Sequence, residues 1–150
     1  MFDVDELLDE SASWAAQSRN PFLTHTIALA RGLAQASLGD PVALATLRAA
    51  INDSQNRIQI GFQAGALSVA LALLGHYQQA AELIGSHSNA KAAYHTLRRS
   101  PEVIAAWKTT RDALGDADYD AAVRRGAARN HEQLISWIIT CLDELIPSAP

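Results

Sequence analysis

Apolar residues along the chain recur at intervals of three and four, the spacing that places them on one face of an α-helix. Leu67 and Leu71 show this spacing, and Leu44 and Leu47 show it further upstream. No segment alternates between apolar and polar residues as a half-buried strand does. The pattern therefore predicts an all-α protein. We expect about nine helices, over residues 4–17, 21–38, 41–52, 57–75, 77–85, 91–99, 101–114, 117–126 and 131–146.

The predicted helix boundaries carry capping residues, prolines and glycines. Asp3 has Glu6 three residues later, which is the spacing of a capping box. Asn20 stands before Pro21, so proline takes the first helical position, where its missing N–H costs nothing. Gly39 is expected to adopt the left-handed conformation that ends a helix. Gly85 is likewise expected to end a helix, and Asp116 is expected to cap the start of another helix.

A Leu-Gly turn followed by an Ala-rich amphipathic run occurs twice, in SLGDPVALATLRAAI and in LLGHYQQAAELIG. Gly39 and Gly75 are 36 residues apart (75 − 39). Stacked helical hairpins of the tetratricopeptide type repeat at about 34 residues. In the second unit, Ala80 is the small residue expected where the two helices of a hairpin meet. The spacing predicts a tetratricopeptide-like array of antiparallel helical hairpins.

The composition agrees with one helical domain. The chain has 150 residues, of which 49% are hydrophobic and 19% charged, and these values are typical of a globular protein. Aromatic residues make up only 6%, which favours close helix packing. We expect residues 1–146 to form a single helical-repeat domain and residues 147–150 to form a frayed tail.

Charge and cysteine content narrow the classes of partner and compartment. The formal net charge of −4 argues against general affinity for nucleic acid. A single cysteine is typical of a reducing compartment. The first ten residues contain five acids and lack the positive start of a signal peptide, and the apolar stretch 64–75 is too short to cross a bilayer. These features predict a cytoplasmic protein without a membrane or nucleic-acid partner.

The C-terminal half resembles the helical tail of LuxR-type and AfsR-like ATP-binding transcriptional regulators and their adenylate-cyclase-linked relatives, which are common in actinobacteria. The likeness covers roughly residues 64–146. The matching residues are Ala80, Ala81, Leu83, Ile84, Gly85, Leu114, Gly115, Tyr119, Ala122, Gly126, Glu132 and Leu134.

The resemblance implies the sensing or interaction region of such a regulator. The chain lacks the family's phosphate-binding loop, G-x-x-x-x-G-K-[ST], and has Val123, Arg124 and Arg125 where the family often has tryptophan. We therefore expect a non-enzymatic interaction or regulatory module without a cofactor, whose partner is another protein or another domain of a larger regulator. The alternative is a small-molecule sensor with its ligand between helices.

The last predicted helix is apolar over more than one stripe, which suggests an interface with a second copy or with another domain. The alternative is that this helix folds back into the core. The candidate interface residues are Leu134, Ile135, Trp137, Ile138, Ile139, Leu142 and Ile146.

Four arginines form a candidate anion patch, for which a solvated helix face is the alternative. They are Arg98, Arg99, Arg124 and Arg125.

The three tryptophans stand on separate helices, where we expect core packing, with a shared ligand pocket as the alternative. They are Trp14, Trp107 and Trp137. Cys141 lies among apolar residues and is expected to be buried and inert. His87 and His95 lack the spacing of a zinc site, so no metal is expected and exposed histidines are favoured.

Overall fold

The computed structural model describes residues 3–51, 57–88 and 100–148, and every regular element in these ranges is an α-helix. The predicted all-α class is therefore confirmed. The helix expected over residues 91–99 lies outside the described ranges. The described helices are α1 (Val4–Ser18), α2 (Pro21–Ser37), α3 (Val42–Ala50), α4 (Arg57–Leu73), α5 (Tyr77–Ser88), α6 (Pro101–Leu114), α7 (Asp116–Ala127) and α8 (His131–Leu145).

Side-chain caps begin three of these helices. The Asp3 carboxylate accepts hydrogen bonds from backbone N–H groups in the first turn of α1. Asn20 caps α2 in the same way, with Pro21 as the first helical residue. Asn130 and Gln133 form a complete capping box at the start of α8, each side chain accepting from the other residue's backbone N–H. These contacts satisfy donors that a helix N-terminus otherwise leaves unpaired.

Three glycines with positive φ follow helices α2, α4 and α6. Their φ angles are 71° at Gly39, 82° at Gly75 and 78° at Gly115. The expectation that Asp116 caps α7 is wrong, since Gly115 occupies the cap position and Asp116 is the first helical residue. The Asp116 carboxylate instead accepts a hydrogen bond of 2.6 Å from Arg111 Nε at the end of α6.

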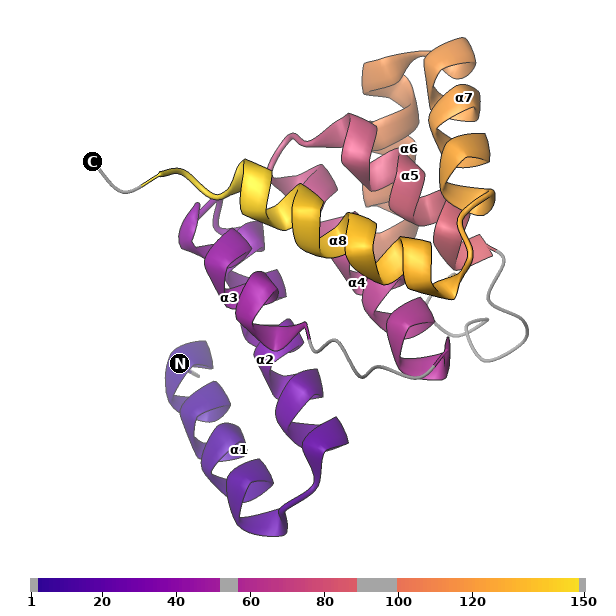
Figure 1. The fold of residues 1–150 in the computed structure, drawn as a ribbon. Helices are drawn as coiled ribbons and strands as arrows, with labels where there is room; N and C mark the ends of the chain where they lie inside the picture. The colour runs from indigo at the N-terminus through magenta and orange to yellow at the C-terminus, as the bar shows by residue number, and fades with distance from the viewer. Residues whose placement is uncertain (1–2, 52–56, 89–99, 149–150) are drawn as a thin grey trace.

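The helices pack as successive neighbours in two rows (Figure 1). α2 contacts α4, and α4 contacts α6, so these three helices form one row. α3, α5 and α7 lie on the other side of that row, and α5 contacts α7 extensively. α8 turns back across α3 and α4, where Asp143 accepts from Arg48 Nε at 2.8 Å. The predicted tetratricopeptide-like register remains a prediction.

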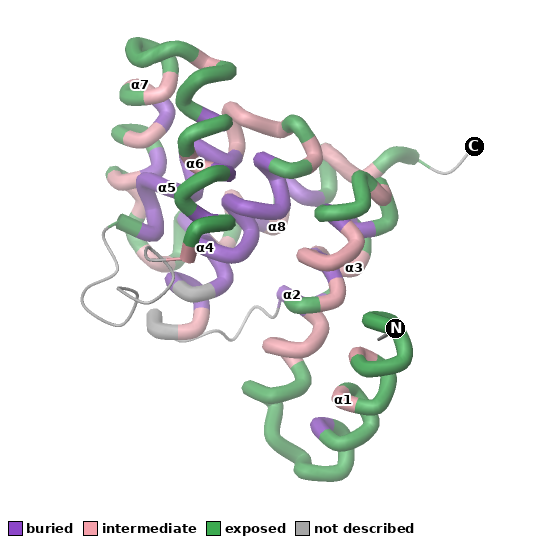
Figure 2. The backbone as a smooth tube through the Cα atoms, turned by 180° about the vertical axis from the view of Figure 1, so that it is seen from behind, coloured by how far each residue is buried: buried purple, intermediate pink, exposed green. Residues whose placement is uncertain are grey.

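The core runs between the two rows and under α8, with buried apolar residues from α2 to α6 and from α8. Figure 2 shows burial concentrated in α4 and α5, whereas α1 is exposed along most of its length. None of the described helices combines the length and the apolar content needed to cross a membrane. The largest fully buried apolar side chains are Leu47, Leu67, Leu71, Leu83, Ile138 and Leu142.

Small residues set the contact between α5 and α7. A Cβ on Gly85 would lie 2.0 Å from the Val123 carbonyl oxygen, and one on Gly126 would lie 1.7 Å from the Glu82 carbonyl oxygen. The expectation that Gly85 ends its helix is therefore wrong: α5 continues to Ser88, because Gly85 serves the crossing with α7. Ala80 is fully buried, and its expected place where the two helices of a hairpin meet remains a prediction.

Candidate interaction surface

A groove of about 340 Å³ lies between α2, α4 and α6. α2 contributes a stripe at helical spacing, and α4 contributes a floor of small and aliphatic residues. Leu73 lies at the end of the floor and is 47% exposed, so the groove opens to solvent. The lining residues are Thr26, Leu29, Ala30, Leu33, Gly65, Ala66, Val69, Leu73, Ser100, Glu102 and Val103.

The polar groups at the groove edge are already engaged. The Thr26 hydroxyl donates a hydrogen bond of 2.8 Å to the Phe22 carbonyl within α2. The Ser100 hydroxyl donates to the Glu102 carboxylate, and this hydrogen bond lowers the pKa of Glu102. The surface that the groove offers to a ligand is therefore mainly aliphatic.

The apolar surface continues beyond the groove. Phe22 and Leu23 precede Thr26 by four and three residues, so they extend the groove-facing stripe of α2, and both are exposed. On α1, the half-buried Leu8 and the buried Ala15 face the body of the protein. Beside them, Leu7 and Trp14 are left in solvent at 50% and 66% exposure.

Helix register places Leu7 and Trp14 on the groove side of the α1–α2 hairpin. Asp9 forms an ion pair of 2.5 Å with Arg31 along one edge of the contact between the two helices. Leu7 lies roughly 160° around α1 from Asp9, at 100° per residue, and therefore lies near the opposite edge. On α2, Ala30 lies roughly 100° around the helix from Arg31, toward the side that lines the groove.

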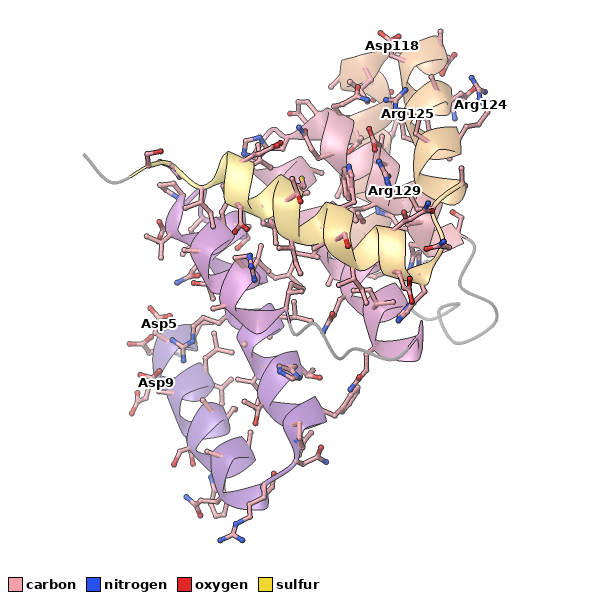
Figure 3. All side chains as sticks on the ribbon, viewed as in Figure 1. Asp5, Asp9, Asp118, Arg124, Arg125 and Arg129 are labelled. Atoms are coloured by element: carbon pink, nitrogen blue, oxygen red, sulfur yellow. The ribbon has the colours of Figure 1, made fainter. Side chains whose placement is uncertain are left out.

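α1 is strongly acidic. Asp5 and Asp9 project from one edge of the helix (Figure 3). Glu6 and Glu10 are also exposed, and by helix register they lie outward of Leu7 and Trp14. The first 18 residues contain no lysine or arginine. An exposed apolar strip with acids along its outer side is therefore present next to the groove.

A buried carboxylate joins three helices on the opposite side of the molecule. Glu82 on α5 accepts from Arg125 Nε at 3.2 Å and from Arg129 Nη2. The Arg129 guanidinium carbon lies 4.2 Å from the ring centre of Trp137 on α8, a cation–π distance. Arg124 points away from the body, while Arg125 and Arg129 turn toward it (Figure 3). This cluster has a structural role, because it fastens α7 and α8 to α5.

The seven candidate interface residues of the last helix all pack against the protein's own core. Leu134, Ile138 and Leu142 belong to the buried cluster. The other four are half-buried against it; they are Ile135, Trp137, Ile139 and Ile146. This arrangement corresponds to the alternative in which the helix folds back. A dimer through α8 stays an untested prediction.

The candidate anion patch is described only in part. Arg98 and Arg99 lie outside the described residues. Arg124 is exposed at the surface of α7. Arg125 pairs with Glu82, so part of its charge is compensated within the protein.

The three tryptophans differ in their surroundings. Core packing is wrong for Trp14, which lies on the surface because α1 contacts the body through only one stripe. Trp107 is half-buried, and its indole Nε1 donates to the Ser68 hydroxyl at 2.9 Å. None of the three tryptophans lines the groove. The exposed Trp14 and the groove itself were missed from the sequence, although the apolar stripe of α2 signals the groove.

Two titratable residues, His87 and Cys141, lie in the core. The expected exposure of His87 is wrong: it is fully buried, with Nδ1 3.1 Å from the Gly61 carbonyl oxygen and its ring edge-on to Trp107. His95 lies outside the described residues. In the described parts of the chain, no three His, Cys, Asp or Glu residues are grouped to hold a metal. Cys141 is buried as expected, and burial raises the pKa of its thiol to about 11.

Comparison of the chain with protein-family models, with curated proteins and with solved structures gives no match.

Proposed function

We propose that the protein is a non-enzymatic protein-interaction module whose groove between α2, α4 and α6 binds an apolar helical segment of a partner protein. The observation that carries the proposal is the aliphatic groove of about 340 Å³, open to solvent at Leu73. Grooves of this kind receive the apolar face of an amphipathic helix, with anchors spaced by three, four and seven residues.

The apolar stripe on α2 favours a chain segment over a small molecule. Phe22 and Leu33 are 11 residues apart (33 − 22). At 1.5 Å per residue the stripe extends about 16 Å, or roughly three helical turns. A helix lying along α2 would contact this whole length, whereas a small ligand would contact only the part inside the groove.

The resemblance of residues 64–146 to regulator tails suggests the biological setting of this partner. On that basis, the bound segment belongs to a transcriptional or signalling regulator, either as a neighbouring domain or as a separate protein.

A small-molecule sensor is the second candidate function. The groove volume of about 340 Å³ supports it, because ligand pockets measure roughly 300–1,000 Å³ and are mostly apolar. A thermal-shift screen of apolar compounds tests this candidate, since a ligand of the folded state raises the melting temperature. Saturable stabilisation that Leu73→Glu abolishes would favour the sensor.

Peptide binding tests the leading proposal. A labelled amphipathic peptide of about 18 residues, or five helical turns, with leucine on one face and glutamine on the other, is titrated with the full chain and followed by fluorescence anisotropy. Leu73→Glu, which places a charge in the groove, should weaken binding about tenfold or more. Val42→Glu is the matched control, because Val42 is 55% exposed and lies on α3 outside the groove lining. Equal effects of both variants, or no binding at all, would contradict the proposal.

A further inference from the structure

The groove-side edge of α1 carries exposed apolar side chains that the groove alone does not explain. Leu7 and Trp14 lie two helical turns apart on this edge, and Trp14 is 66% exposed. Tryptophan is rich in contact area and is enriched among the residues that dominate binding energy at protein interfaces. Its exposure beside the groove therefore marks a contact point for a partner.

We infer that this edge of α1 extends the binding surface and that its occupant is a basic amphipathic helix, with lysine or arginine beside its apolar residues. The inference rests on the proposed function, because the same partner helix would contact both the groove and α1. It adds the charge of that partner and names Trp14 and Leu7 as contact residues.

The acidic residues beside the apolar strip are the reason for proposing a basic occupant. Glu10 is three residues after Leu7 and four before Trp14, so its carboxylate lies on the same turns as the apolar strip. Glu6 lies one turn earlier on the same outer side. Within the described residues, neither glutamate forms an ion pair; on the other edge Asp9 pairs with Arg31, while Asp5 forms no ion pair. The strip therefore has uncompensated negative charge beside it.

A second copy of the chain fits this edge less well. Pairing α1 with α1 of another copy would bring two lysine- and arginine-free helices together, and like charges at such distances are destabilising. A basic helix would instead form ion pairs with Glu6 and Glu10. Its lysine or arginine side chains could also stack on the Trp14 ring, which attracts cations through its face.

Two model peptides with the same leucine pattern test the inference. One has lysine on its polar face and the other has glutamate. We expect the full chain to bind the lysine peptide at least about tenfold more tightly than the glutamate peptide, with an affinity that falls as salt rises. Trp14→Ala should weaken lysine-peptide binding by about thirtyfold, and circular dichroism should show that the exposed substitution leaves the fold intact.

A charge-matched pair of variants separates local from general attraction. Glu6→Gln/Glu10→Gln should weaken binding of the lysine peptide several-fold. Asp118→Asn/Glu132→Gln changes the net charge equally, at exposed residues of α7 and α8, and should leave binding nearly unchanged. Equal loss in both double variants would overturn the inference.

The remaining outcomes distinguish the inference from the function on which it rests. Binding that responds to Leu73→Glu but not to Trp14→Ala or to peptide charge would refute the role of α1 and leave the groove function standing. A chain that light scattering shows to dimerise through Trp14 would make a second copy the occupant and refute the basic partner. Failure of every peptide to bind would refute both proposals.

Discussion

Glu82 is the residue on which three helices converge. Its buried carboxylate accepts hydrogen bonds from Arg125 and Arg129, and Arg129 in turn lies over Trp137. The pair with Arg129 is well shielded from water, since the two side chains are 10% and 17% exposed. A buried charge that loses its partner is far more costly than an exposed one.

Glu82→Gln should therefore lower the free energy of unfolding by about 2–3 kcal/mol, because Arg129 would keep its charge without a carboxylate partner. Glu144→Gln removes an exposed carboxylate from α8 and should change the free energy by less than about 0.5 kcal/mol. Urea denaturation measures both values. If the two variants were equally stable, Glu82 would have no fastening role.

Cys141 should contribute a pH dependence at high pH. Burial raises the pKa of its thiol from 9.0 to about 11, so the unfolded chain loses this proton first. The stability due to the neutral thiol is thus fully present below pH 9 and is lost as the pH rises toward about 11. Denaturation curves measured across this pH range give the free energy of unfolding, which should fall less steeply with pH for Cys141→Ala than for wild type. An unchanged slope would contradict the raised pKa.

At the scale of elements, the α5–α7 crossing depends on two glycines. Each would place an added Cβ against a backbone carbonyl, at 2.0 Å for Gly85 and 1.7 Å for Gly126. A backbone group cannot move aside as a flexible side chain can. A Cβ at Gly39, by contrast, would meet nothing within 4 Å, so alanine there carries only the strain of its positive φ.

Gly126→Ala should accordingly destabilise the protein more than Gly39→Ala, by about 3 kcal/mol or more against roughly 1–2 kcal/mol. Thermal denaturation followed by circular dichroism gives the order. A larger effect at Gly39 would show that α5 and α7 are not in backbone contact.

These elements also show how far the sequence leads. Capping chemistry is local, so Asn20, Pro21 and Gly39 identified helix boundaries correctly. The prediction for Gly85 was wrong because a glycine after an apolar run can either end a helix or allow another helix to pack closely. Which of the two occurs depends on α7, about 40 residues away in the sequence. The repeated small residues of Ala81-x-x-x-Gly85 and 122–126 could have signalled the close crossing.

At the scale of the molecule, the path of α8 decides which surfaces stay open. The apolar width of the last helix is visible in the sequence, but periodicity alone does not reveal that α8 returns across α3 and α4. The groove could not be predicted from the sequence either, because its lining residues come from three helices that are separated in sequence. Trp14 looked like a core residue since its spacing is helical, and spacing does not show which side of a helix is covered.

Ile135→Glu/Ile139→Glu tests the intramolecular role of α8. Both residues are half-buried against the core, so two charges there should lower the melting temperature markedly and leave α8 poorly packed. Light scattering and thermal denaturation are measured together. A wild-type dimer that becomes a fully stable monomer in this variant would instead support the predicted interface.

Hydrogen–deuterium exchange on the full chain, with and without the lysine peptide at saturation, tests most directly whether α1, α2, α4 and α6 present one binding face. α1 contacts the body through a single stripe, so its amides should exchange rapidly in the free protein. We predict that the peptide slows exchange in α1, in the first turns of α2 and along the groove helices, with little change in α7. Protection confined to α7 and α8, or no protection at saturation, would contradict this prediction.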